Sequence, residues 1–353
     1  MKALSGMKAL GTNGQKVAFA LASVLVSLGL TAGLVTLVGR DPLMAFRFVL
    51  EGAFGTSASL ANVLNFLIPL ALAVVGLVVT FRAGLWNIGV EAQLMAGAIG
   101  ASYVALFVRG LPAPLWIVCA MMGGALAGMS VSLVIGWLKT RMGVNEIFGG
   151  VAMNALTNVY AIYLISGPWQ PPEGGSAQAT APFPREVWLT PLSPDFPINL
   201  PYLLLVAGAM LAVSWLLRSS RWGLELKASG QNARSAALLG VPTVRVTFSA
   251  LLVCGALAGL GGAHRVLETY HSLRPLTSGG IGFLGVLVVL LAGARVFWAV
   301  LVALGFGAIL TGSTRLRIAM QLDSSLANVL QGLLVLSILL MNGVRERFFH
   351  HES

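Results

Sequence analysis

"LANVLNFLIPLALAVVGLVVTF", residues 60–81, is an apolar run without one charged side chain. A hydrocarbon core about 30 Å thick needs roughly 20 residues of α-helix to cross it, so this run is long enough to span a bilayer. Backbone groups inside a membrane must be hydrogen-bonded within the protein, and the run lacks the alternating pattern of a barrel strand. The stretch therefore predicts a transmembrane helix.

Comparable runs recur along the whole chain. Of its 353 residues, 57% are hydrophobic and only 10% are charged, which is far too apolar for a soluble domain. We expect an all-α fold, a polytopic transmembrane bundle of about ten helices that forms a single domain over residues 1–353. The expected spans are 17–38, 60–81, 88–106, 114–137, 146–166, 200–217, 246–263, 280–294, 297–313 and 325–342.

Lysine and arginine predict the orientation, because cytoplasmic loops are enriched in them. Placing both termini inside puts the larger share of the 22 basic residues in cytoplasmic segments. The first run, 17–38, is longer than the apolar core of a signal peptide, so we expect an uncleaved anchor. Topology and contact with anionic lipid of the bilayer explain the net charge of +10, and no nucleic-acid partner is expected.

Two connections between spans are long. Residues 167–199 are rich in Pro, Gly and Ser and predict an external loop over the bundle with at most one short helix. Residues 218–245 form a cytoplasmic loop that contains "KASGQNARSAALLGV", in which Asn232 is a good N-cap and Gly240 a good terminator. A helix this short needs something to pack against, either the bundle or another protein.

Two similar segments suggest an internal duplication. "GGALAG" at 123–128 recurs as "GALAG" at 255–259, and the two spans run in opposite directions in the expected topology, as an inverted repeat requires. A chance match in a chain rich in Ala, Gly and Leu is the alternative. In either case these small residues would let helices approach closely.

Catalytic signatures are missing from the sequence. It contains no H-x-x-x-H, C-x-x-C or G-x-S-x-G pattern and no Walker A lysine, so we expect no catalytic, metal or cofactor site and no ATPase activity in this chain. His264 and His271 are expected to be surface histidines near an outer boundary, and Cys119 and Cys254 lie within expected spans.

Polar residues interrupt the apolar stretch "FRAGLWNIGVEAQLMAGA" at 81–98, as in discontinuous helices that line a solute path. Its carboxylate, Glu91, is either a functional ionisable group or a brace for a broken helix, with Asn87 or Gln93 as partner. Amides within spans can also be ordinary interhelical contacts. The side chains expected to line a solute pathway are Asn65, Phe66, Trp86, Asn87, Glu91, Gln93, Asn154 and Asn158.

These stretches resemble permease subunits of bacterial ABC importers of the ribose and branched-chain amino acid class, and within it the nucleoside (basic membrane protein-associated) branch. "FRAGLWNIGVEAQLMAGA" is similar to that branch's F-x-x-G-x-x-N-I-G-x-E-G-Q, "NEIFGGVAMNAL" at 145–156 to its next polar motif, and "KASGQNARSAALLGV" to its cytoplasmic loop. "GIGFLGVLVVLLAG" at 280–293 is similar to a later block. Arg265 departs from the pattern, because the branch often has an acidic residue near that position.

The resemblance implies a permease that moves nucleosides inward by alternating access, in the bacterial cytoplasmic (inner) membrane. It implies three partners: a cytoplasmic ABC ATPase that uses the ATP, a second permease of the same or a similar chain, and an extracytoplasmic solute-binding protein. The capped helix would then be the coupling helix that docks on the ATPase. Gly230, Asn232, Ala236 and Gly240 match the family's coupling loop, and Arg234 is the coupling residue expected to face the ATPase.

Alternatives remain at the level of the sequence. A simple sugar such as ribose or galactose is the second candidate solute, and a branched-chain amino acid is the third because the spans offer few partners for a zwitterion. An ion-coupled secondary transporter that uses Glu91 would need no ATPase, but it leaves the capped helix unexplained. A membrane-embedded enzyme has no catalytic constellation to support it.

Overall fold

The computed structural model describes residues 39–171, 178–189, 191 and 193–319, together with isolated positions between 26 and 37 and residue 332. In this part of the chain the regular structure is entirely helical, and seven helices are long and apolar enough to cross a membrane. The all-α, multi-pass prediction is confirmed, while most of 17–38 and nearly all of 325–342 lie outside the described residues. The seven helices are α4 (Ser57–Arg82), α5 (Val90–Phe107), α6 (Ala113–Met142), α7 (Glu146–Ser166), α8 (Leu200–Ser219), α11 (Thr243–His264) and α13 (Val296–Ala319).

Two compact units make up the chain, one of residues 64–305 and one of residues 1–63 with 306–353. In the smaller unit, Asp41 caps α3 (Pro42–Phe54), a helix that the sequence did not predict. The Asp41 carboxylate accepts the N–H of Leu43 at 2.8 Å, and this hydrogen bond fixes the start of α3. Within this unit Glu51 pairs with Arg47 and with Arg315, at 2.7 and 3.3 Å.

Glycines bring three helices of the larger unit into backbone contact. A Cβ on Gly97 of α5 would lie 2.2 Å from the carbonyl oxygen of Gly259 on α11, and one on Gly128 of α6 would lie 2.2 Å from that of Gly255. Gly124 of α6 packs on Gly259, whereas Gly128, one turn later, packs on the earlier residue Gly255. The two helices therefore run in opposite directions. The two similar segments therefore meet face to face and antiparallel, and the predicted close approach is confirmed.

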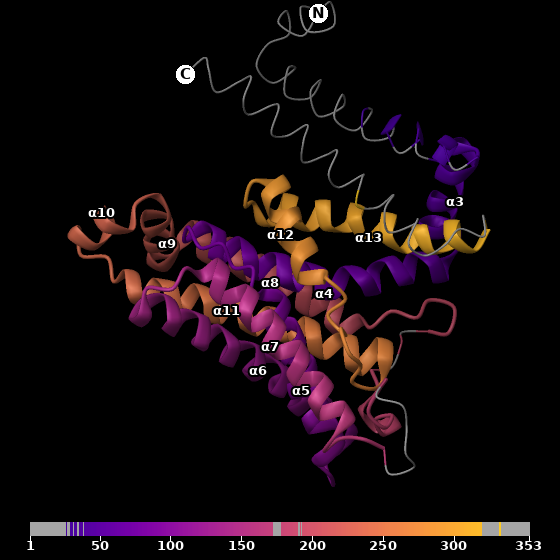
Figure 1. The fold of residues 1–353 in the computed structure, drawn as a ribbon, viewed down its shortest axis with the longest axis horizontal. Helices are drawn as coiled ribbons and strands as arrows, with labels where there is room; N and C mark the ends of the chain where they lie inside the picture. Colours follow the sequence, from indigo (N-terminus) through magenta and orange to yellow (C-terminus); the bar gives the residue numbers. More distant parts are fainter. Residues whose placement is uncertain are drawn as a thin grey trace, which may run out of the picture. The chain divides into compact units, whose positions relative to one another are not determined.

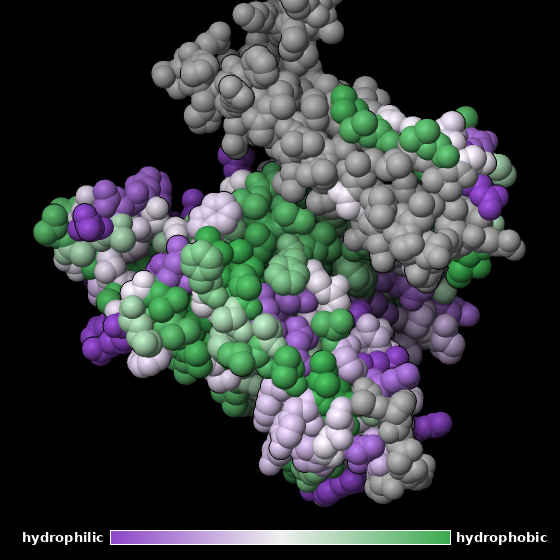
Figure 2. Space-filling view, in the orientation of Figure 1, coloured by the Kyte–Doolittle hydropathy of each residue, from purple (hydrophilic) through white to green (hydrophobic). Residues whose placement is uncertain are grey.

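The surface of the larger unit matches a membrane environment. Apolar residues gather over α6 and α7, whereas hydrophilic residues gather around α9 and α10 (Figure 2). Leu126 on α6 and Val159 on α7 are 61% and 65% exposed. Large exposed apolar side chains on a long helix are stable where lipid surrounds them.

The predicted crossing at 280–294 is wrong in length. The helix here is α12 (Ile281–Ala292), and its 12 residues extend only about 18 Å, too short for a 30 Å core. Gly280 before it and Gly293 after it both have positive φ, 76° and 67°, which stops the helix at each end. This is a half-length apolar helix.

Other connections contain more helix than the sequence indicated. α11 continues through a π-helical turn, η2 (Arg265–Tyr270), beyond the expected end at 263. The loop 218–245 holds α9 (Arg221–Gln231) and α10 (Ala233–Leu238), which lie at one end of the larger unit (Figure 1, left). The described part of 167–199 contains the short 3-10 helix η1 (Arg185–Val187).

Candidate functional site

The connection between α4 and α5, residues 83–89, is a partly buried break in the helical path. Gly84 has φ +73°, and the next polar group, Asn87, is fully buried. The Asn87 amide donates to the Gln93 side-chain oxygen and to the Cys254 sulfur of α11, both at 3.2 Å. The two buried amides therefore hold each other and tie the break to α11.

Asn154 of α7 forms hydrogen bonds with backbone groups on both sides of the break. Its side-chain oxygen accepts the N–H of Ala92 at 2.8 Å, and its amide donates to the carbonyl of Ile88 at 3.2 Å. Because both groups lie at or beside the break, one side chain replaces helical hydrogen bonds on both sides of it. One turn further along α7, Asn158 donates to the Asn154 carbonyl at 3.0 Å.

Glu91 caps the half-length helix α12. Its two carboxylate oxygens accept the N–H groups of Gly280 at 2.9 Å and Gly282 at 2.7 Å, although the residues lie about 190 positions apart in sequence. The side chain is only 4% exposed, and the positive end of a helix dipole stabilises a carboxylate there. The suggested partners Asn87 and Gln93 are wrong for this carboxylate; they pair with each other instead.

Asn65 and Phe66 lie far from this break. Asn65 precedes Arg82 by 17 residues along α4, about 26 Å of helix. The Asn65 amide donates to the carbonyl of Pro197 at 2.7 Å and to the carboxylate of Glu268 at 2.9 Å. Trp86, in contrast, belongs to the break and is 47% exposed. The eight expected pathway residues therefore form two groups, one near each end of α4.

The group at the Asn65 end contains Glu268 and Tyr270, which the sequence did not single out, beside Arg265, which was noted only as a departure from the family pattern. Glu268 lies on the π-helical turn, between Asn65 and the hydroxyl of Thr269. The guanidinium of Arg265 donates to the Tyr270 hydroxyl and lies 4.7 Å from the centre of that ring. For Glu268 and Tyr270 the signal in the sequence was the density of polar residues in "RVLETY", at the end of an apolar span.

The two histidines near this end are not solvated surface groups, so that prediction is wrong. His264 is fully buried, with its ring 4.7 Å from that of Tyr202 in an edge-to-face arrangement. His271 is half-buried and stacks on Trp188, with ring centres 3.8 Å apart. Burial lowers the pKa of His271. The π-helical turn carries the chain further than expected and folds both rings against other elements.

The short helix α10 has the ends that the sequence predicted. The Asn232 side chain accepts the N–H of Ser235 at 3.0 Å, and Gly240 beyond the helix has φ +86°. Ala236 is buried, whereas Arg234 is exposed. Two further apolar side chains, Leu238 and Leu239, are 89% and 85% exposed. The tip of α10 thus presents an apolar and basic surface.

α9 connects this tip to the break between α4 and α5. A Cβ on Gly230, at the end of α9, would lie 2.2 Å from the Arg82 carbonyl oxygen and 3.0 Å from the Gly84 nitrogen. At the other end of α9, the Trp222 indole donates to the Ser249 hydroxyl of α11 at 2.8 Å. The backbone of the loop therefore rests directly on the backbone of the break.

A family model described as "Branched-chain amino acid transport system / permease component" matches residues 59–339, more than half of the chain. The chain belongs to this family. The expected class, membrane permease subunits of ABC importers, is confirmed, and the protein is a multi-pass membrane protein.

Three curated relatives are similar to this permease over most of both chains. A glucose ABC transporter permease of Haloferax volcanii is 26% identical, over 90% of this chain and 85% of its own. A nucleoside ABC transporter permease of Lactococcus lactis is 25% identical, over 85% and 84%. A guanosine ABC transporter permease of Bacillus subtilis is 28% identical, over 89% and 91%.

In this permease, six of the eight expected pathway residues have side-chain hydrogen bonds to other protein groups: Asn65, Asn87, Glu91, Gln93, Asn154 and Asn158. The contacts of Asn87, Glu91, Gln93 and Asn154 brace the helix break and the start of α12. Whether they also contact solute stays a prediction, as it does for Asn65, Phe66, Trp86 and Asn158.

Proposed function

We propose that this permease is the transmembrane subunit of an ATP-driven importer that moves nucleosides inward by alternating access. Two of the three relatives named above are nucleoside or guanosine permeases. A nucleoside is neutral, and the two carboxylates buried in the described part of the chain fit such a solute because protein groups already engage them: Glu91 contacts α12, and Glu146 pairs with Lys139 at 2.5 Å. Glucose is the second candidate solute, supported by the Haloferax relative.

The contact of Gly230 with the α4–α5 break is the main support for a mechanism that couples α10 to the membrane helices. A six-residue helix is not stable by itself, and Leu238 and Leu239 would gain from burial against a partner. We assign that partner as a cytoplasmic ATPase subunit, which contacts these leucines and Arg234 and hydrolyses the ATP. Residues 218–245 and both termini then lie in the cytoplasm, and the chain lies in the bacterial cytoplasmic membrane.

Movement of α10 would reach the membrane helices by direct backbone contact. Backbone atoms cannot rotate away as a side chain can, so a displacement of α9 at Gly230 pushes on Gly84. The break next to Gly84 is tied to α7 through Asn154 and to α12 through Glu91. ATP-driven closure of the ATPases would therefore shift α5, α7 and α12 together and change which side of the bundle is open.

Two ATPase subunits require two coupling helices, so the transporter contains a second permease, either identical or similar. On the other side, a solute-binding protein would deliver the solute to the surface that 167–199 covers. Two described residues of this loop are hydrogen-bonded to the segment after η2: the N–H of Phe183 donates to the carbonyl of His271 at 2.8 Å, and that of Thr180 to the carbonyl of Leu273 at 3.0 Å.

A secondary transporter that uses Glu91 as its ion site is disfavoured by the geometry. Both oxygens of the carboxylate are occupied by backbone N–H groups of α12. Each time the carboxylate bound a proton, one of its oxygens would become a donor, and a buried N–H group of α12 would lose its acceptor.

Transport assays test the proposal directly. Cells with and without the gene are given labelled adenosine, guanosine, uridine, ribose or glucose, under ATP depletion and separately under a protonophore. We expect gene-dependent nucleoside uptake that ATP depletion abolishes. Uptake of glucose or ribose alone would replace the nucleoside assignment, and uptake that only the protonophore abolishes would overturn the ATP-driven mechanism.

Variants of α10 test the coupling assignment. Leu238→Asp and Arg234→Glu should abolish uptake while the protein still reaches the membrane, and Gly240→Pro should do the same because proline cannot adopt φ +86°. Leu238→Met, which keeps the apolar surface, is the matched control and should transport normally. Normal uptake by Leu238→Asp and Arg234→Glu would refute the assignment of α10.

A further inference from the structure

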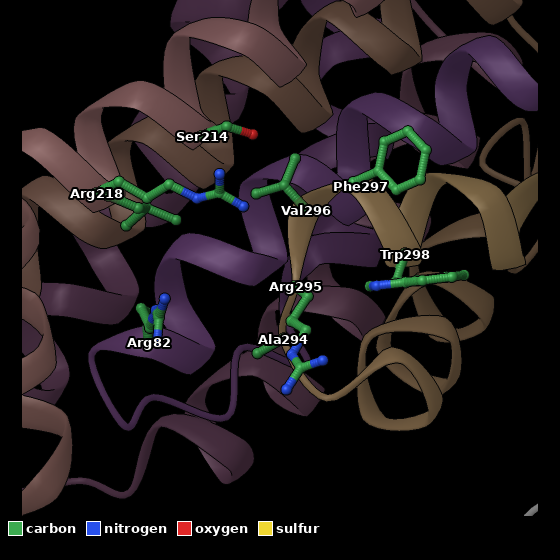
Figure 3. A pocket seen from close by; sticks show the side chains of 9 residues that line it. Arg82, Ser214, Arg218, Ala294, Arg295, Val296, Phe297 and Trp298 are labelled. Atoms are coloured by element: carbon green, nitrogen blue, oxygen red, sulfur yellow. The ribbon is translucent and has the colours of Figure 1, made fainter. Parts of the chain in front are cut away.

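A cavity of about 440 Å³ lies in the larger unit, at the end that carries α9. Three arginines from three different elements line it: Arg82 ends α4, Arg218 lies in the last turn of α8, and Arg295 lies between α12 and α13 (Figure 3). None of its lining residues is acidic. Three segments distant in sequence thus bring positive charge to one hollow.

The three guanidinium groups are unneutralised within the described part of the chain. The ion pairs there join Arg47 and Arg315 to Glu51, and Lys139 to Glu146, and none includes a cavity arginine. No side-chain hydrogen bond joins the cavity arginines to another described residue either. Like charges gathered in a hollow with partly apolar walls repel one another unless an anion lies between them.

The lining favours a phosphate group as that anion. A guanidinium group matches phosphate oxygens with two parallel hydrogen bonds, and the Ser214 hydroxyl of α8 adds a further donor. Two aromatic residues of the lining, Phe297 and Trp298, are 60% and 52% exposed. Aromatic side chains beside basic ones at a helix end are typical of the level at which lipid head groups lie.

We propose that this cavity binds a phosphate group between Arg82, Arg218 and Arg295, with an anionic membrane lipid as its source. The bound group would tie the ends of α4 and α8 to the α12–α13 connection, beside the break on which α9 rests. The site does not depend on which solute the permease transports.

Thermal unfolding of the purified full-length chain in uncharged detergent tests this proposal. The additions are dioleoylphosphatidylglycerol, dioleoylglycerol, which has the same acyl chains but no phosphate, and sodium phosphate against sodium chloride at equal ionic strength. We expect a saturable rise in melting temperature with phosphatidylglycerol and none with dioleoylglycerol. A rise with sodium phosphate as well would show that free phosphate also binds, and no rise with either phosphate compound would overturn the proposal.

Variants locate the binding. Arg218→Gln combined with Arg295→Gln should raise the lipid concentration for half-maximal stabilisation at least about tenfold. Arg245→Gln removes an exposed arginine that does not line the cavity, so it should respond as the unmodified protein does. If the double variant does not fold, Arg295→Gln alone, in an exposed connection, serves instead. An unchanged lipid response in these variants would refute the site.

Discussion

Replacing Glu91 with glutamine distinguishes a structural carboxylate from one that carries protons. Glutamine keeps one acceptor oxygen for the N–H groups of Gly280 and Gly282 and sets an NH₂ group against the other. A hydrogen bond to a charged group contributes about 1.5–3 kcal/mol, so Glu91→Gln should lower the free energy of unfolding by about 2–3 kcal/mol. Glu91→Ala removes both acceptors and should cost about 3–6 kcal/mol.

Denaturant titration of the purified proteins measures these losses, with Glu186→Gln as the matched control. Glu186 lies exposed on η1, so its substitution should leave stability unchanged. Uptake by Glu91→Gln, corrected for the amount of folded protein, should still depend on ATP. A Glu91→Gln protein that is as stable as the original chain but transports nothing would refute the bracing role and restore the ion-site hypothesis.

Three further perturbations follow from the same contacts. Asn154→Ala removes two hydrogen bonds from the α4–α5 break and should cost about 2–3 kcal/mol in denaturant titration, against about 1 kcal/mol for Asn158→Ala; equal losses would contradict the bracing role. Gly262→Ala puts a Cβ 1.9 Å from the Leu94 carbonyl oxygen and should cost about 3 kcal/mol, so an unchanged melting temperature would show that α5 and α11 do not meet there. Burial lowers the pKa of His271, so the unfolded chain binds its proton more readily: stability should be full above about pH 6.5 and fall below it. His271→Gln should flatten this slope in melting temperature, and an equal slope in both proteins would refute its origin at His271.

Hydropathy predicted the long helices well, because a membrane span is defined by its length and lack of charge. The run 60–81 corresponds to α4, Ser57–Arg82. The half-length of α12 could not be read in this way, since its start is fixed by Glu91, a residue in another helix. α9 was missed because "RWGLELKASGQ" is polar; its helix depends on the Ser220 cap and on the Trp222 contact with Ser249.

Local sequence signals predicted the ends of α10, but they did not predict the contacts around the α4–α5 break. The ends of α10 depend on Asn232 and Gly240 themselves, so they were visible in the sequence. The polar residues near the break were recognised by type, but their partners are backbone groups on other helices. The pairing of Glu91 with Gly280 spans nearly 190 residues, and no pattern in one sequence predicts a contact of that kind.

The capping of α12 also affects which solutes the membrane interior would attract. The N-terminus of a helix carries about half a positive charge, and such ends in transporters commonly hold anionic groups of the solute. Here the carboxylate of Glu91 already fills that position, so this helix end repels a second anion. A phosphate group that approached this end of α12 would therefore be repelled rather than bound.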